Sequence, residues 1–259
     1  MNEARDYASS QFTPTKTITP QPSTSTMKVA ISLGGSLLTG KSGDDYVKLD
    51  PARFTRYADV IKGLHNEGHQ LMVVCGGGKP ARYFIDIAKT YNAPPELLDY
   101  LGIKSSHINA LIFMAALGDI AEQPTVYETP GECFDGRSPG KVWIGGGHRP
   151  GTSTDYRTVQ FAEVMDADLI INATDIDGVY TKNPKTHSDA KKLPDLTFQQ
   201  LETIIKENTR QAPGEYGLFD LAAVKLSKRL GKPVIIIDGT DPEEITRAVN
   251  GTHSGSTIR

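Results

Sequence analysis

The 259-residue sequence has only two cysteines, Cys75 and Cys133, with no CxxC pair and no cysteine and histidine cluster. This scarcity excludes a disulfide-built scaffold and a structural zinc site, and it indicates a reducing compartment. Both thiols are expected to be small buried hydrophobes. Apolar runs such as Leu71–Cys75 and Val234–Ile237 are far shorter than the roughly 20 residues that cross a bilayer. A transmembrane protein is therefore not expected.

An excess of positive charge is also missing. The chain has 28 Lys and Arg against 31 Asp and Glu, a formal net charge of −3. No pervasive positive field is available to hold nucleic acid or an anionic membrane, so neither is expected as a partner. Hydrophobic residues at 38% and charged residues at 23% are typical of a globular protein with a sizeable core. We expect a soluble, cytoplasmic protein.

The first 26 residues differ from the rest of the chain. Serine, threonine and proline occupy half of Met1–Thr26, and aliphatic residues are almost absent. Such a segment buries too little apolar surface to offset its ordering entropy, so a disordered tail is predicted. It lacks the basic and apolar regions of a secretory signal, and early acidic residues disfavour a transit peptide. Residues 27–259 are predicted to form a single domain.

From Met27 onward, short Val- and Ile-rich strands alternate with amphipathic helices, which predicts an α/β fold with a mostly parallel sheet covered by helices on both faces. Asp50 and Pro51 supply an N-cap and a first-turn proline for one helix, and Gly68 follows its end. Strands are predicted at Lys28–Leu33, Gln70–Cys75, Thr125–Glu128, Val142–Gly145, Leu169–Asn172, Val234–Ile237 and, as an edge strand, Ser256–Ile258. Further helices are predicted at Pro80–Tyr91, Gly102–Leu117, Asp155–Ala167, Phe198–Ile205, Leu218–Leu230 and Pro242–Val249.

Three glycine clusters stand where predicted strands end: Gly34-Gly35, Gly76–Gly78 and Gly145–Gly147. Ligands of open α/β sheets bind beyond the carboxyl ends of the strands. Glycine lets the backbone approach a phosphate closely, and a following helix adds N–H donors and a favourable dipole. A single Gly-Gly pair is more often a plain turn, but three such loops together predict phosphate binding.

One glycine segment, Gly35–Ser42, matches the Walker A pattern G-x-x-x-x-G-K-[ST] and follows a strand. A true P-loop needs a helix to begin at the Gly-Lys-Ser step. Here the chain continues through Gly43–Leu49 without helical periodicity before the cap at Asp50. We interpret the match as coincidental, so Lys41 is expected to be dispensable.

Other candidates are ambiguous when each is taken alone. Thr174–Thr181 follows a buried strand, and its Asp-Gly step suits a hairpin tip as well as a site. Arg82 lies four residues after Gly78 and faces either an anion or solvent. Lys225 stands in an otherwise apolar helical segment, although lone lysines are usually solvated. Asp99 is either a ligand group or the N-cap of the helix expected near Gly102.

Taken together, the motifs resemble the amino-acid kinase superfamily, and most closely the archaeal-type UMP kinases. The resemblance covers about Met27 to Arg259. It rests on the segments Val29–Ser36, Val74–Arg82, Gly147–Asp155, Ala173–Pro184, Asp220–Lys225 and Gly251–Ile258.

The resemblance implies an open αβα sandwich that transfers the γ-phosphoryl group of MgATP to UMP, and assembly as a homo-hexamer built from dimers. It implies that Lys225 and Arg82 neutralise charge on the transferring group and that no protein side chains bind a metal. The ATP contacts would be Ser32, Leu33, Gly34, Gly35, Ser36, Gly78, Arg82, Thr174, Asp175, Tyr180 and Asn183. The UMP contacts would be Gly77, Asp99, His148, Arg149, Pro150, Gly151, Thr152, Ser153 and Thr154.

The chain departs from the family pattern at two positions. Ser32 stands where many members carry a lysine, and Asn183 stands where an aspartate is common. Isopentenyl phosphate kinase is the nearest rival, but the chain has no histidine between Gly78 and Lys104, where that family has one close after its second glycine motif. A metal-oxyanion storage or nucleotide-sensing protein on the same fold is the non-catalytic alternative.

Overall fold

The computed structural model describes residues 25–39, 49–129, 131, 138–184, 186–209 and 219–259. The predicted tail therefore lies outside the described residues up to position 24, and so does Cys133. In the described part, an eight-stranded sheet has the order β3-β4-β2-β1-β5-β9-β10-β8. The strands are β1 Lys28–Leu33, β2 Gln70–Cys75, β3 Ala121–Tyr127, β4 Val142–Gly145, β5 Leu169–Thr174, β8 Asp195–Leu196, β9 Val234–Asp238 and β10 Ser256–Ile258.

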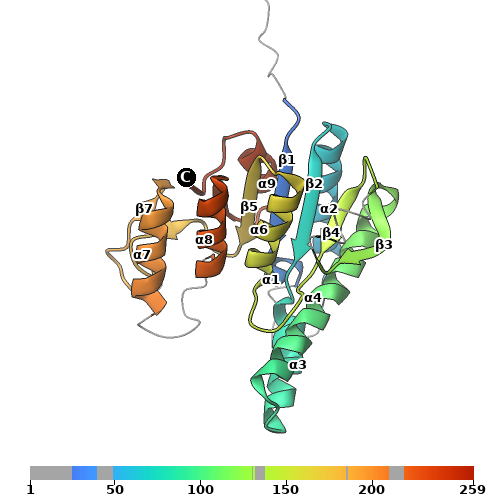
Figure 1. Ribbon diagram of the computed structural model, residues 1–259, viewed down its shortest axis with the longest axis horizontal. Helices are drawn as coiled ribbons and strands as arrows, with labels where there is room; N and C mark the ends of the chain where they lie inside the picture. Colours follow the sequence, from blue (N-terminus) through green and yellow to red (C-terminus); the bar gives the residue numbers. More distant parts are fainter. Residues whose placement is uncertain (1–24, 40–48, 130, 132–137, 185, 210–218) are drawn as a thin grey trace, which may run out of the picture.

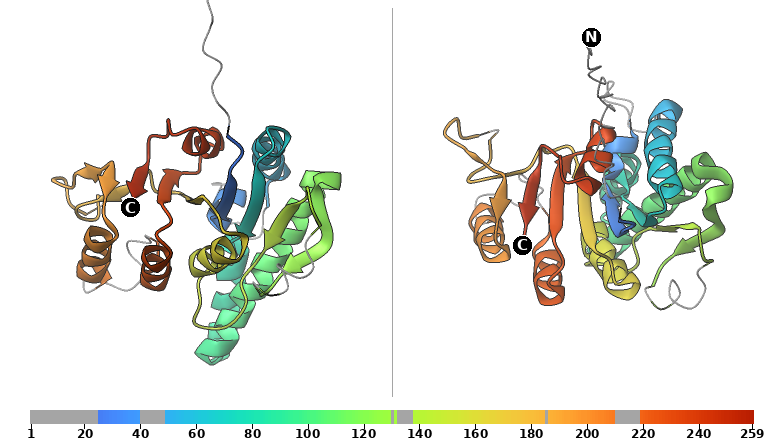
Figure 2. Two further views of the ribbon diagram at one scale, coloured as in Figure 1. Left: turned by 45° about the horizontal axis from the view of Figure 1, so that its top comes forward. Right: turned by 90° about the horizontal axis from the view of Figure 1, so that it is seen from above.

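The sheet is parallel from β3 to β9, and β10 runs antiparallel to β9. Helices cover both faces, which confirms the predicted mostly parallel α/β sandwich (Figure 1). Seen from above, α6, α7 and α8 line one side of the sheet and α2 the other (Figure 2). The helices are α1 Gly35–Leu38, α2 Pro51–Asn66, α3 Gly78–Thr90, α4 Pro95–Leu117, α6 Thr154–Met165, α7 Phe198–Thr209, α8 Leu221–Leu230 and α9 Glu243–Val249, with a 3-10 turn at Gly118–Ile120.

Side chains of the central strands point alternately to the two faces of the sheet and contribute to two hydrophobic cores. Val29 and Ile31 of β1 pack with α2, α4 and α9, whereas Ala30 between them packs with α6, α7 and α8. Successive side chains of a strand point to opposite faces, so a strand covered on both faces is apolar throughout. Cys75 belongs to the first core, and its burial raises the pKa of the thiol to about 12. The expectation that Cys75 is a small buried hydrophobe is confirmed.

Local signals place several helix ends correctly. The Asp50 side chain accepts a hydrogen bond from the Ala52 N–H at 3.0 Å and caps α2, with Pro51 in the first turn. Gly231, with φ +63°, ends α8 in the left-handed conformation that glycine favours. Gly68 adopts φ +92° just after α2.

Other predicted boundaries are wrong. Helix α4 begins at Pro95, not near Gly102, because Pro95 stands at the first helical position, where proline is favoured. Strand β3 begins at Ala121, four residues before the predicted start. Ser256–Ile258 is not an edge strand, since β10 lies between β9 and β8. The two-residue strands β6 Val179–Tyr180, β7 Lys192–Leu193 and β8 were not predicted. Two residues are too few to show a strand periodicity.

Helix α4 bears on the expectation that the chain does not cross a membrane. With the turn that follows it, Pro95–Ile120 is long and apolar enough to cross a bilayer by length and composition alone, and 44% of its most apolar window is buried. It packs against α2, α3 and the strands β2, β3 and β4. Core helices of soluble proteins pass the same test, so one such helix is weak evidence for a membrane span.

Candidate active site

The candidate site lies at the carboxyl ends of the central strands. Strand β1 pairs with β2 on one side and with β5 on the other, so the crossover direction reverses at β1. Open α/β sheets bind ligands at such a switch point. The three glycine clusters stand at the ends of β1, β2 and β4 on this edge, as the sequence predicted, and Thr174 is the last residue of β5.

The first two glycine loops interlock through their backbones. A Cβ atom on Gly35 would overlap the Gly78 amide nitrogen, and one on Gly78 would overlap the Gly35 carbonyl oxygen. The Gly76 N–H also donates to the Leu33 carbonyl oxygen at 2.9 Å. The Leu33 side chain itself is buried in the core. Only glycine permits this approach, which holds the amino end of α3 against the amino end of α1.

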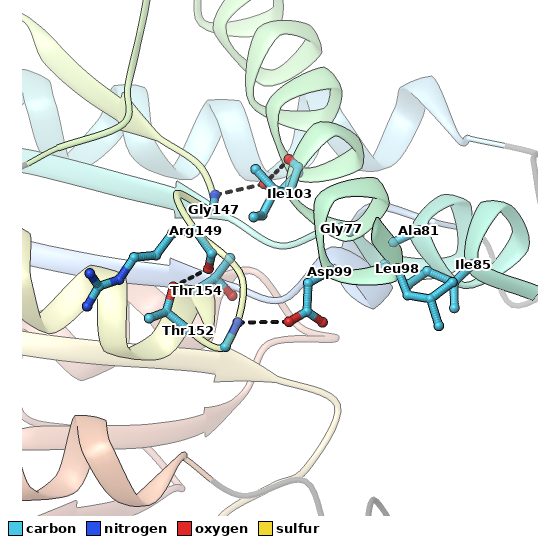
Figure 3. A pocket seen from close by; sticks show the side chains of 14 residues that line it. Gly77, Ala81, Ile85, Leu98, Asp99, Ile103, Gly147, Arg149, Thr152 and Thr154 are labelled. Atoms are coloured by element: carbon cyan, nitrogen blue, oxygen red, sulfur yellow. Dashed lines mark hydrogen bonds between the residues drawn. The ribbon is translucent and has the colours of Figure 1, made fainter. Parts of the chain in front are cut away.

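Next to these loops, a pocket of about 350 Å³ opens between α3, the first half of α4 and the loop that follows β4 (Figure 3). Of the predicted UMP contacts, the pocket gathers Gly77, Asp99, Arg149, Gly151, Thr152 and Thr154. Its volume falls within the range of small-molecule sites. Gly78, a predicted ATP contact, also lines it, and so do Ala81 and Gly147, which stand in the predicted motifs without a contact assigned to them. The lining residues that the sequence did not indicate are Ile85, Leu98, Gly102, Ile103 and Ser106.

Asp99 reaches across this pocket. The Gly151 N–H donates to its Oδ2 at 2.8 Å, so the carboxylate joins α4 to the loop after β4 (Figure 3). Asp99 is exposed and lies four residues after Pro95, inside the helix. The alternative of an N-cap for a helix near Gly102 is therefore wrong, because α4 begins earlier.

Only some of the UMP contacts predicted in the loop after β4 line the pocket. Thr152 Oγ1 donates to the Arg149 carbonyl oxygen at 2.7 Å, while the Arg149 side chain extends away from Asp99 (Figure 3). His148, Pro150 and Ser153 are absent from the pocket lining. Ser153 instead caps α6, since its Oγ accepts from the Tyr156 N–H at 2.9 Å.

Behind the pocket, hydroxyl and carboxylate groups link β1, α6 and α8. The buried Ser32 donates to Asp155 Oδ1 at 2.8 Å, and Ser153 donates to Asp220, the N-cap of α8. Burial raises the pKa of Asp155 to about 6; the Ser32 hydrogen bond opposes this shift and the nearby Asp220 charge adds to it. Asp155 is not among the predicted site residues, although it ends the motif Gly147–Asp155.

The predicted nucleoside contacts lie past the end of β5. Tyr180 donates from its hydroxyl to Asp177 Oδ2 at 3.0 Å, and burial and Asp177 together raise the pKa of the phenol. Lys192 pairs with the same carboxylate at 3.1 Å. Thr174 is partly buried, Asp175 is exposed, and Asn183 is 6% exposed.

The two predicted catalytic cations are exposed. Arg82 lies in the second turn of α3, and Lys225 lies in the second turn of α8. Neither lines the 350 Å³ pocket. Ser36 lies in α1, which begins at Gly35; the Gly40-Lys41-Ser42 step of the Walker-like match falls outside the described residues.

Comparison with known proteins gives a consistent result. The model of the amino acid kinase family matches residues 27–238. The uridylate kinase of Methanobrevibacter smithii is 34% identical over 232 residues, which cover 90% of this chain and 99% of that protein. The crystal structure of the Archaeoglobus fulgidus uridylate kinase superposes with a TM-score of 0.78 at 33% identity, covering 90% of this chain and 100% of that one. The Bacillus anthracis UMP kinase, at 22% identity and a TM-score of 0.72, shares the fold over 90% of this chain and 96% of its own.

Proposed function

Because the chain belongs to the amino acid kinase family, we propose that it is a UMP kinase, which transfers the γ-phosphoryl group of ATP to UMP. The observation that carries this proposal is the pocket bounded by Gly77, Asp99 and the loop after β4, set beside the interlocked glycine loops. Its position at the switch point suits a phosphorylated acceptor next to a nucleotide phosphate chain. Uridylate kinases about 34% identical over 90% of the chain support the choice of UMP.

In this proposal, UMP occupies the 350 Å³ pocket, with Asp99 accepting hydrogen bonds from the ribose hydroxyls. The loop from His148 to Thr154 and the Gly77 backbone enclose the rest of the nucleotide. ATP lies against the loops at Gly34–Ser36 and Gly78, with its nucleoside toward Thr174, Asp175, Tyr180 and Asn183. Ser32 supports this site through Asp155 rather than through a phosphate.

Phosphoryl transfer depends on positioning and charge neutralisation more than on covalent chemistry. A phosphate oxygen of UMP attacks the γ-phosphorus, the bond to the β,γ-bridging oxygen breaks, and ADP and UDP result. Backbone N–H groups of the glycine loops, Arg82 and Lys225 stabilise the negative charge of the transferring group. Mg²⁺ enters as MgATP, bound through the phosphate oxygens.

We further propose that the protein is a soluble, cytoplasmic homo-hexamer built from dimers. The helices α3 and α4 project together beyond the sheet (Figure 1). Every large hydrophobic residue found exposed in the described part of the chain lies on these helices or at the end of α3. They are Phe84, Ile87, Tyr91, Leu97, Tyr100, Ile108, Leu111 and Ile112. Exposed hydrophobic residues gathered on two neighbouring helices favour an interaction surface, which a second copy would bury.

An ADP-release assay with UMP, CMP, dUMP, isopentenyl phosphate and fosfomycin tests the activity. We expect Mg²⁺-dependent turnover with UMP as the preferred acceptor. Turnover with isopentenyl phosphate and none with UMP would leave only the family assignment. Bound molybdate or tungstate in the purified protein, without turnover, would favour the oxyanion-storage alternative.

A further inference from the structure

One face of α4 contacts two of the three glycine loops. Asn109 Nδ2 donates to the Gly76 carbonyl oxygen at 2.7 Å and to the Gly77 carbonyl oxygen at 3.2 Å. Ser106 lies one turn earlier, and its Oγ accepts from the Gly147 N–H at 2.8 Å. The loops after β2 and β4 are therefore both tied to one rigid helix.

His107 contacts the other polar backbone group of Gly147. Its Nε2 lies 2.6 Å from the Gly147 carbonyl oxygen, which can only accept, so Nε2 carries the proton. Its Nδ1 lies 3.5 Å from Glu128 Oε1, on the loop that follows β3. Two consecutive residues of α4 thus bind both polar groups of a single glycine, one through its N–H and one through its carbonyl.

The packing leaves these loops little freedom to shift. A Cβ atom on Gly146 would overlap the His107 ring, and one on Gly147 would lie 3.1 Å from Ile103 Cγ1. On the other loop, a Cβ atom on Gly77 would lie 3.0 Å from the Gly102 carbonyl oxygen. The backbone of each loop rests directly on α4, and Ser106 and Asn109 are both about 1% exposed.

We infer that Ser106, His107 and Asn109 are positioning residues, which set the separation between the loop after β2 and the loop after β4. This inference rests on the proposed function, in which the first loop contacts both nucleotides and the second encloses the acceptor. A displacement of about 1 Å between reacting groups can lower a rate by roughly 10²-fold. His107 and Asn109 do not line the pocket and act on the reaction through the loops, whereas Ser106 both lines the pocket and holds Gly147.

The test compares His107→Phe with His107→Gln in the full-length protein. Phenylalanine keeps the ring and removes the donor, whereas glutamine can still donate to the Gly147 carbonyl oxygen. We expect kcat to fall about 10- to 100-fold in H107F and in Ser106→Ala, and to stay within about threefold of wild type in H107Q. The KM for UMP should rise more than the KM for ATP. Lys104→Gln, at an exposed position of the same helix, is the matched control and should behave as wild type.

Hydrogen exchange of the peptide that contains Gly145–Gly147 supplies a readout that needs no substrate. Exchange should be faster in H107F and S106A than in wild type and H107Q, while the melting temperatures of H107F and H107Q stay close. Wild-type kcat and exchange in H107F, or equal losses in H107F and H107Q, would overturn the inference. If the wild type phosphorylates another acceptor of the panel and not UMP, the proposed function fails. The positioning inference is then decided by the ratios of variant to wild-type kcat measured with that acceptor.

Discussion

The Ser32 hydroxyl donates a hydrogen bond to the Asp155 carboxylate across 2.8 Å, which joins β1 to the first turn of α6. Burial raises the pKa of Asp155 from 3.8 to about 6, and the charge of Asp220 acts in the same direction. The folded protein therefore favours the neutral acid more than the unfolded chain does. Ionisation of Asp155 costs stability as the pH rises from about 4 to about 6, and above pH 6 the cost is complete.

The first prediction follows from that cost. Asp155→Asn keeps an oxygen that accepts from Ser32 and cannot ionise, so it should stabilise the fold at pH 7.5 by up to roughly 3 kcal/mol. The gain should shrink as the pH falls and be nearly absent at pH 4. Urea unfolding of both proteins at the two pH values measures the difference. A less stable Asp155→Asn protein at pH 7.5 would contradict this account of the pair.

The second prediction concerns Lys225. Lys225→Met keeps most of the aliphatic stem and removes the charge proposed to stabilise the transferring phosphoryl group. Loss of one such preorganised group typically lowers kcat by about 10²- to 10³-fold. Because Lys225 is exposed, the melting temperature should barely change. Lys228→Met, the same substitution one turn later, is the control and should retain turnover. A wild-type kcat in Lys225→Met would contradict this role, and Arg82 would be the next candidate for stabilising the transferring phosphoryl group.

The third prediction separates two roles of Asp99. Asp99→Asn keeps an oxygen that can accept from the Gly151 N–H, so a residue that only anchors the loop should tolerate it. A carboxylate that accepts from ribose hydroxyls would lose charge-assisted hydrogen bonds worth very roughly 1.5–3 kcal/mol. We expect kcat/KM for UMP to fall about 10- to 100-fold, with the KM for ATP little changed and weaker discrimination against dUMP. Unchanged UMP kinetics would leave Asp99 as a loop anchor alone.

The fourth prediction tests the apolar face of α3 and α4. The double variant Ile108→Glu/Ile112→Glu places two carboxylates on one exposed stripe of α4, where burial against a second copy would be costly. Sedimentation should show a smaller assembly than wild type, with the fold retained. Thr203→Glu, at an exposed position of α7, introduces a single carboxylate on another surface and should leave the assembly unchanged. An unaltered oligomer in the double variant would place the interface on another surface.

Features that depend on neighbouring residues could be predicted from the sequence. The Val- and Ile-rich strands, the Asp50 cap and the glycine loops identify the sheet, the ends of several helices and the edge that holds the site. The pocket could be predicted in part, since Gly77, Asp99 and Gly151 stand in motifs that the resemblance carries.

The missing part of the site depends on contacts between distant segments. Ser106 and His107 contact a glycine about 40 residues away, and Ser32 contacts a carboxylate 123 residues away. The residues next to Ser32, Ser106 and His107 in the sequence do not indicate which distant residue each of them contacts. The Pro94-Pro95 step resembles a corner in the sequence and predicts a later start for α4, whereas Pro95 is the first residue of the helix.

The interlock of Gly35 with Gly76 and Gly78 changes how mutational scans of this protein should be read. A Cβ atom at any of the three positions would enter the opposite backbone whether or not a nucleotide is present. Substitutions there should fail during folding, and their lost activity will report low yield of native protein. The proposed phosphate contacts are better tested by substituting Ser36 and Arg82, which are not among the interlocked glycines.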